Sequence, residues 1–334
     1  MNVKMFGEIC DAFGPSGFEE DVIRTVAKYC KGLELENDAM NNLYARMPGE
    51  DPEKPVVMIL TNLPAHTVMI RTRSGKLVRG IISSKPIHFM NEAERASQSL
   101  SIETLSVDVG AVSRKEVTEV FGISIGDPAV PEVSFSYDEE RDLCFGKAFD
   151  NRAGCACIID TMTRLCGEKD QLAVRVTGAF AAQEEVGTRG ATVTSQIVRP
   201  DLAIVFEGSP SDDFYFSAAQ TQGHMRGGVQ IRRMDKSYIS NPVFIEYAEE
   251  LAKKFGIPFQ ETVRRGGSTN AGKISLTAKA VPVLVLGVPS RYVHTHYNFC
   301  AKSDLEAAAD LAVEVIRGLD AEKIRHICRQ DILK

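Results

Sequence analysis

The sequence contains no tryptophan and no long hydrophobic run. Only 7% of its 334 residues are aromatic, and no stretch approaches the roughly 18 apolar residues that a membrane-spanning helix needs. The opening MNVKMFGEIC has neither the basic start nor the apolar run of a secretory signal. We therefore expect a protein that has no membrane partner and stays in the cytoplasm.

Positive charge is also in short supply. The chain has 39 Lys and Arg against 45 Asp and Glu, a formal net charge of −6, and it has no basic stripe that could neutralise a phosphate backbone. Nucleic acid is therefore not expected as a partner. The eight cysteines form no CxxC pair, so we expect free thiols in a chain of this length.

The hydrophobic pattern differs between two parts of the chain. From residue 144 onward, apolar runs such as LAVRVTGAFAA, LAIVFEG and VPVLVLGVP alternate with helical patterns, and PVVMILTN earlier in the chain is a similar buried-strand run. Residues 63–143 show short alternating runs separated by turns. We predict an α/β catalytic domain over 1–62 and 144–334, with a mixed sheet covered by helices on both faces, and a small β-rich insertion domain over 63–143.

Local signals predict where three helices begin or end. Ser16 with Glu19, and Ser303 with Glu306, have the spacing of a capping box at a helix start. Gly256 is expected to close the helix PVFIEYAEELAKKF.

Acidic residues and histidines follow the predicted buried strands, where ligands of open α/β sheets collect. They are Asp150, Glu184, Glu185, Glu207, His294 and His296. Each has an ordinary explanation when taken alone, such as a helix cap for Asp150 or a solvated pair for the adjacent glutamates. Carboxylate and imidazole are also ordinary ligands of zinc, cobalt or manganese. One glutamate of the pair could bind a metal while the other holds the water that the metal activates.

An ordered series of motifs resembles the family of glutamyl aminopeptidases, tetrahedral aminopeptidases and proteins called endoglucanase M. The series is GPSGFEE, SKPIH, SVDVGA, GKAFDNRAG, QEEVGTRGA, GGSTNAG and VPSRYVHTH, and it spans nearly the full length. The resemblance implies a zinc-dependent exopeptidase-like fold that binds two metal ions, usually zinc or cobalt. It also implies removal of N-terminal residues from short peptides and homo-oligomeric assembly, commonly as dodecamers, through the insertion.

The same resemblance implies roles for five residues. Asp150 would bridge the two ions, and Glu185 and His294 would complete one metal site. Glu207 would serve the other ion. Glu184 would be the catalytic general base, which takes a proton from the attacking water and passes it to the leaving amine.

The chain departs from the family at the second ion. Where the family has a ligand histidine in an AH-x-DE-IG run, this chain has Asn62, and the insertion that follows is shortened. His66 is a poor substitute because the connection is short, and Asn270 stands where the family usually has aspartate. Since one ion would keep only Asp150 and Glu207, we predict at most one strongly bound divalent metal, either zinc, cobalt or manganese.

Three functions are compatible with these observations. The leading one is a metal-dependent aminopeptidase-like hydrolase with a degraded metal site and reduced activity. The alternative is a non-catalytic homologue that binds peptides or assembles with an active paralogue, which the missing histidine suggests. A glycosidase is least favoured, because two adjacent glutamates at one strand end are poorly placed to flank a glycosidic bond.

Overall fold

The computed structural model describes residues 1–49, 54–62, 68–83, 106–278 and 280–329. The chain divides into two compact units, Met1–Pro64 with Val133–Lys334, and Ala65–Glu132. The hydrophobic pattern predicts that residues 133–143 belong to the insertion. They lie in the first unit instead, because strand β9 (Ser136–Asp138) pairs with strand β10 (Leu143–Gly146).

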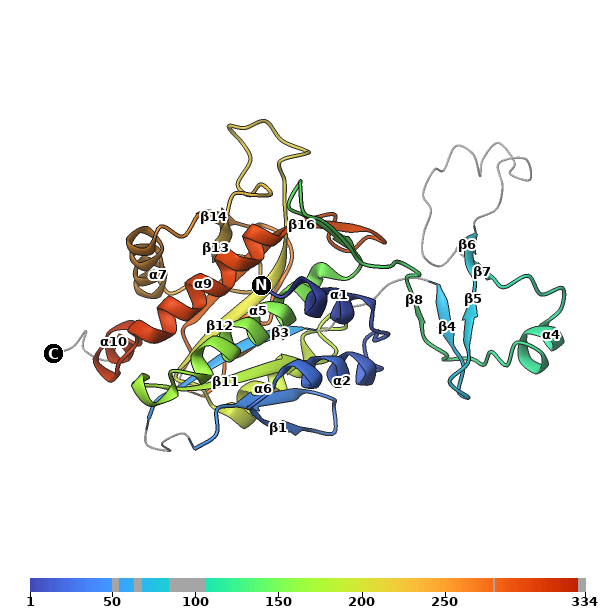
Figure 1. The fold of residues 1–334 in the computed structure, drawn as a ribbon, viewed down its shortest axis with the longest axis horizontal. Coiled ribbons are helices and arrows are strands. Elements are labelled where there is room, and N and C mark those ends of the chain that lie inside the picture. Colours follow the sequence, from blue (N-terminus) through green and yellow to red (C-terminus); the bar gives the residue numbers. More distant parts are fainter. Residues whose placement is uncertain (50–53, 63–67, 84–105, 279, 330–334) are drawn as a thin grey trace. The chain divides into compact units, whose positions relative to one another are not determined.

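One mixed sheet organises the first unit (Figure 1). Its centre consists of four neighbouring parallel strands in the order β11 (Arg175–Ala181), β3 (Val56–Asn62), β12 (Leu202–Pro210) and β15 (Val283–Arg291). Antiparallel strands extend it on both sides: β2 (Leu43–Arg46) and β1 (Glu34–Asn37) beyond β11, and β16 (Asn298–Ala301), β10 and β9 beyond β15. Strand β13 (Val229–Met234) also pairs with β15, and β14 (Phe259–Val263) pairs with β13.

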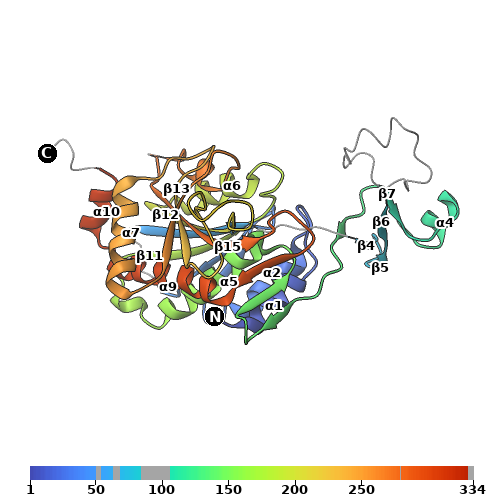
Figure 2. The same ribbon diagram turned by 90° about the horizontal axis from the view of Figure 1, so that it is seen from above.

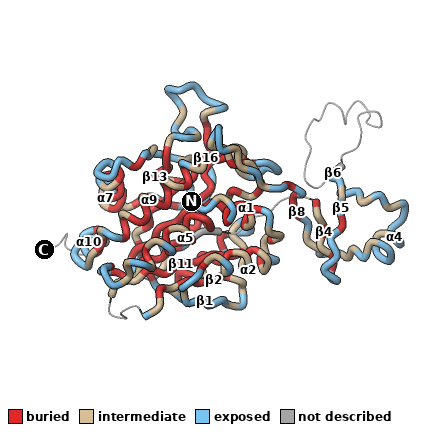
Figure 3. Tube along the Cα trace, in the orientation of Figure 1, coloured by how far each residue is buried: buried red, intermediate tan, exposed pale blue. Residues whose placement is uncertain are grey.

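Alternate residues of the central strands pack into two hydrophobic cores. In β12, Leu202, Ile204 and Phe206 belong to the larger core, whereas Ala203 and Val205 belong to the smaller one. This alternation is what a sheet buried on both faces requires, because successive side chains point to opposite sides. The buried strands form the continuous red centre of Figure 3.

Helices cover both faces of the sheet, as Figure 2 shows from above. The larger core is covered by α1 (Val3–Asp11), α2 (Glu20–Tyr29), α5 (Phe149–Cys166), α7 (Pro242–Phe255), α9 (Lys302–Gly318) and α10 (Ala321–Ile327). The smaller core is covered by α6 (Arg189–Val198) and α8 (Ala271–Ile274). The predicted mixed sheet with helices on both faces is confirmed.

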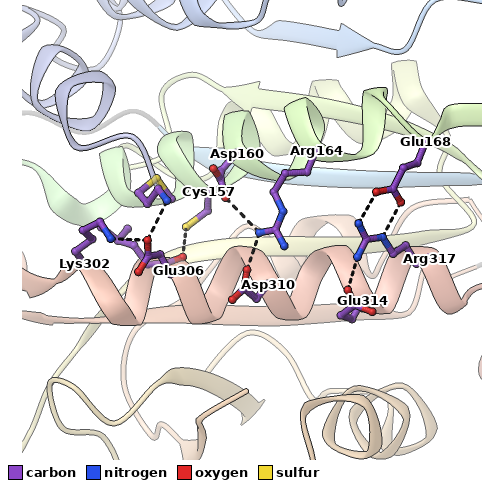
Figure 4. Close-up of polar contacts among 11 residues, drawn as sticks. Cys157, Asp160, Arg164, Glu168, Lys302, Glu306, Asp310, Glu314 and Arg317 are labelled. Carbon is purple, nitrogen blue, oxygen red and sulfur yellow. Dashed lines mark hydrogen bonds and ion pairs between the residues drawn. The ribbon is translucent and has the colours of Figure 1, made fainter. Parts of the chain in front are cut away.

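Helices α5 and α9 pack against each other and are joined by ion pairs at their margin (Figure 4). Arg164 of α5 lies 2.6 Å from Asp310 of α9, and Arg317 of α9 lies 2.6 Å from Glu168 beyond the end of α5. Such partly exposed pairs contribute less than about 1 kcal/mol each. The apolar contacts of the two helices therefore hold α5, whose first turn carries Asp150.

The predicted helix ends are partly correct. Helix α7 ends at Gly256, whose φ of 67° is left-handed, as predicted. Helix α2 begins only at Glu20, and the Glu19 carboxylate instead accepts hydrogen bonds from the N–H groups of Gly17 and Gln183. Helix α9 has no side-chain cap, and the Ser303 hydroxyl donates to Asp142. The two predicted capping boxes are wrong because Glu19 and Ser303 have partners distant in the sequence.

The second unit is small and contains short strands. Strands β5 (Leu77–Arg79), β4 (Met69–Arg71) and β8 (Ala129–Val130) form one sheet, and β6 (Ile81–Ser83) pairs with β7 (Ser106–Asp108). Helix α4 (Arg114–Glu119) follows β7. Within the residues that the structure describes, no helix in either unit combines the length and hydrophobicity needed to cross a bilayer.

Candidate metal centre

The candidate residues gather where the parallel strands of the sheet end. Glu184 and Glu185 follow β11, Glu207 lies near the end of β12, and His294 follows β15. Asp150 comes from the first turn of α5. All five line one cavity of about 340 Å³. The structure thus brings together five of the six residues that the sequence singled out, the five to which the family resemblance gives roles, and those roles remain predictions.

Close backbone packing places Asp150 against β12. A Cβ atom added at Gly208 would lie only 2.6 Å from the Asp150 Cα, so glycine is what allows this approach. Asn151 then anchors the turn: its amide donates to the Phe206 carbonyl at 2.6 Å and to Glu207 Oε2 at 3.1 Å. The side-chain oxygen Oδ1 of Asn151 accepts from the Gly154 N–H at 2.9 Å. Asn151 therefore takes the capping role, which leaves Asp150 available to the cavity.

The acidic pair lies in a turn rather than on the strand itself. Strand β11 ends at Ala181, and Gln183 has a left-handed φ of 55°. The Glu184 carbonyl then accepts the N–H groups of Gly187 and Thr188. Glu184 and Glu185 consequently line the same cavity, whereas a regular strand would point them to opposite faces.

His294 completes a group of three metal-ligand side chains. Its Nε2 lies 3.0 Å from Asp150 Oδ2 and 3.6 Å from Glu185 Oε2. One ligand atom from each of the three residues lies within 4.8 Å of the others. His294 lies in a turn and has a left-handed φ of 63°, and His296, which the sequence also places after this strand, does not line the cavity.

The electrostatics of the cavity are those of crowded, half-buried carboxylates. Burial, together with the charge of Asp150, raises the pKa of Glu185 to about 7. Burial and the same charge raise the pKa of Glu207 well above its usual value. The hydrogen bond to Asp150 and the surrounding carboxylates raise the pKa of His294 to about 9. Each shift shows that the cavity favours an added positive charge.

Unpaired oxygens support the same conclusion. Asp150 Oδ1 and Glu207 Oε1 are buried and have no hydrogen-bond partner among the described residues. Buried carboxylate oxygens without a partner are costly. The donor set of two carboxylates and one imidazole fits a zinc, cobalt or manganese ion, and a cation would also satisfy these oxygens.

Three residues bear on the predicted loss of the second ion. The backbone of Asn62 ends β3 and pairs with Ala181, while His66 lies outside the described residues. Asn270 is fully buried, and neither its amide nitrogen nor its amide oxygen has a hydrogen-bond partner in the part of the chain that the structure describes.

Two arginines of the cavity were missed by the sequence analysis. Arg232 of β13 is buried, donates to the Ser209 hydroxyl and lies 3.6 Å from Asp235 Oδ2. Arg264 follows β14 and lies 2.7 Å from Asp212 Oδ2. Arg232 lies within the strand run VQIRRM, where a buried charge has no sequence signal of its own, so only the sheet pairing reveals it.

Comparison with known proteins identifies the class. The family model described as M42 glutamyl aminopeptidase matches residues 59–311. The glutamyl aminopeptidase of Lactococcus lactis subsp. cremoris is 29% identical over 77% of this chain and 70% of its own length. The lysyl aminopeptidase of Pyrococcus furiosus is 24% identical over 95% and 97%, respectively.

Solved structures agree with this class. A TET aminopeptidase from a marine sediment archaeon, Thaumarchaeota archaeon SCGC AB-539-E09, superposes with a TM-score of 0.90 at 28% identity, covering 97% of this chain and 98% of its own. The dodecameric PhTET1 shares the fold, with a TM-score of 0.80 at 21% identity over 96% of this chain and 100% of its own. The chain belongs to the M42 glutamyl aminopeptidase family, whose members are hydrolases, and the predicted resemblance is confirmed.

Proposed function

We propose that this protein is a metal-dependent aminopeptidase of reduced activity that removes N-terminal residues from short peptides. The observation that carries the proposal is the convergence of Asp150, Glu185 and His294 on one cavity with Glu184. The three would hold one zinc, cobalt or manganese ion. When bound, the ion would polarise the scissile carbonyl and acidify a water molecule.

Glu184 acts as the general base in this proposal. Its carboxylate lines the cavity beside the three ligands. It takes a proton from the attacking water and delivers that proton to the nitrogen of the leaving amine. The amide bond breaks, and the products are a free amino acid and a shortened peptide.

Fewer ligands are available for a second metal ion. Asp150 Oδ1 and Glu207 Oε1 are two oxygens that it could use, but the family histidine is replaced by Asn62. Two carboxylate oxygens without an imidazole are too few for a tight zinc site. We propose that Glu207 contributes at most to a weak second site, and this is the reason that we expect reduced activity.

The arginines favour an acidic first residue in the substrate. Arg232 and Arg264 both line the cavity that holds the candidate ligands, and guanidinium groups bind carboxylates by charge-assisted hydrogen bonds. A glutamate or aspartate side chain would therefore be preferred over lysine; the Lactococcus lactis relative is called a glutamyl aminopeptidase.

Assembly and location complete the proposal. We propose a cytoplasmic homo-oligomer; the solved PhTET1 structure, which shares the fold, is a dodecamer. The second unit exposes Ile81, Val112 and Ile125, which are 70%, 93% and 88% accessible in the isolated chain. In the proposed oligomer, a contact through the second unit would cover these side chains.

The deciding experiment compares Glu184→Gln with the wild type on aminoacyl p-nitroanilides in the presence of zinc, cobalt or manganese. We expect kcat to fall about 100- to 10,000-fold while the bound metal is retained. Glu246→Gln is the control, because it makes the same change from carboxylate to carboxamide at an exposed position of α7. Equal rates in Glu184→Gln and the wild type would favour the non-catalytic homologue instead.

A further inference from the structure

The turn that carries the acidic pair is held by side chains from the N-terminal part of the chain. Strand β11 ends at Ala181, so the N–H groups of Ala182 and Gln183 lie beyond its ladder. The Ala182 N–H donates to Asn42 Oδ1 at 2.8 Å, and the Gln183 N–H donates to Glu19 Oε1 at 3.0 Å. These two bonds span 140 and 164 residues of sequence.

Asn42 is oriented by its own neighbours. Its amide nitrogen donates to Asp38 Oδ2 at 2.8 Å, which fixes Oδ1 toward Ala182. Asn42 is fully buried. A Cβ atom at Gly190 would lie 2.5 Å from Asn42 Oδ1 and 2.3 Å from the Ala182 carbonyl oxygen, so the start of α6 closes tightly over this contact.

Glu19 is a buried carboxylate that binds backbone N–H groups of two turns. It is fully buried, and its Oε1 accepts the N–H groups of Gly17 and Gln183 at 2.8 and 3.0 Å. Its Oε2 has no hydrogen-bond partner within the described ranges. Because a buried carboxylate is costly, an acidic residue here is better explained by its hold on the Gln183 turn than by packing.

We propose that Glu19 and Asn42 are positioning residues that fix the Ala182–Gln183 turn, so that Glu185 reaches Asp150 and His294 and Glu184 faces the same cavity. Neither side chain lines the cavity. Both act through the backbone of the residues just before the pair. This inference rests on the proposed function, because it assigns the turn a task at the metal centre.

A packing role and a positioning role predict different results. Packing alone would lower the stability of the whole domain and leave the folded protein's metal affinity unchanged. Positioning would weaken zinc binding in protein that is still folded, in the way that partners of metal ligands typically change affinity by about 10- to 100-fold. It would also expose the Ala182 and Gln183 amides to exchange.

The experiment measures zinc affinity by chelator competition and amide hydrogen exchange in Glu19→Ala, Glu19→Gln and Asn42→Ala. Glu20→Gln is the control, because Glu20 is the adjacent carboxylate and bonds Asn41 instead of the turn. We expect zinc affinity to fall about 10- to 100-fold in Glu19→Ala and Asn42→Ala, with faster exchange at residue 183 or 182, respectively. Glu19→Gln keeps an acceptor oxygen and should recover most of the affinity.

Two results would overturn the proposal. One is a zinc affinity within threefold of the wild type in folded Glu19→Ala or Asn42→Ala. The other result uses Glu19→Gln and applies even if Glu19→Ala does not fold. It is a Gln183 amide that exchanges without protection in a variant whose zinc affinity equals that of the wild type. Activity is measured separately: a wild type without Glu184-dependent turnover would refute the proposed function, whereas the affinity and exchange results would still test the turn.

Discussion

Gly208→Ala tests whether the contact between β12 and α5 sets the position of Asp150. The new Cβ atom would lie 2.6 Å from the Asp150 Cα and 2.7 Å from both the Asp150 nitrogen and the Phe149 carbonyl oxygen. Carbon atoms in contact are ordinarily about 3.5 to 4.0 Å apart. All three neighbours are backbone atoms, so no flexible side chain can yield. The first turn of α5 must therefore move by about 1 Å.

Two effects should follow from this displacement. Overpacking of this kind costs about 1 to 3 kcal/mol of unfolding free energy, which urea denaturation measures. A catalytic group misplaced by about 1 Å can cost about 100-fold in rate, and Asp150 is also a proposed ligand, so zinc affinity should fall as well. Both kcat and the zinc dissociation constant are to be measured on folded protein.

Gly167→Ala is the matched control. Gly167 follows the other end of α5, its φ is −69°, and the nearest atom to an added Cβ is the Arg164 carbonyl oxygen at 3.7 Å. An alanine there should change stability by less than about 0.5 kcal/mol and leave the site unchanged. If Gly208→Ala keeps both kcat and zinc affinity within threefold of the wild type, the contact between Gly208 and the Asp150 backbone does not set the position of Asp150.

Three further predictions concern pH, the core and the substrate. In the folded, metal-free protein the pKa of His294 is raised to about 9, so the charged histidine stabilises the fold below its unfolded pKa, and this stabilisation is lost as pH rises through 9. Because zinc must displace that proton, zinc affinity measured by chelator competition should rise about tenfold per pH unit from 7 to 9 and then level off. A zinc affinity that does not change with pH over this range would contradict the prediction. Arg152→Ala should lower the unfolding free energy in urea by about 3 kcal/mol or more, because buried Arg152 donates to the carbonyls of Ile9, Ala12 and Gly14; a loss below about 1 kcal/mol would show that these bonds are dispensable. Arg264→Ala should lower kcat/KM for glutamyl substrates at least about tenfold more than for leucyl substrates, and an equal loss on both would argue against a carboxylate site.

Much of the fold could be predicted because it depends on strong local patterns. The apolar runs that became β3, β11, β12 and β15 are buried on both faces, and such runs are distinctive. The end of α7 could also be predicted locally, because the left-handed φ of a helix C-cap favours glycine, and Gly256 occupies that position. The capping boxes failed because a local motif was outweighed by distant partners: Glu19 bonds Gln183 rather than its own helix.

The candidate site was predictable in membership but not in geometry. Charged residues after buried strands identified Glu207 and His294, because strand ends of such sheets meet. No sequence pattern could show that Glu184 and Glu185 follow a left-handed Gln183, that His296 does not line the cavity, or that Gly208 admits the backbone of Asp150. Those features depend on contacts between segments far apart in the sequence. Arg232 illustrates the same limit, since its nearness to Glu207 arises only through β15, which separates β12 from β13.

The most direct test is the zinc content of the protein after dialysis against buffered zinc, measured by plasma mass spectrometry for the wild type and for His294→Ala. We predict one tightly held ion per chain in the wild type and none in His294→Ala, because Asp150 and Glu185 alone leave too few ligands. Two tightly held ions per chain, or an ion retained by His294→Ala, would contradict a centre built from Asp150, Glu185 and His294.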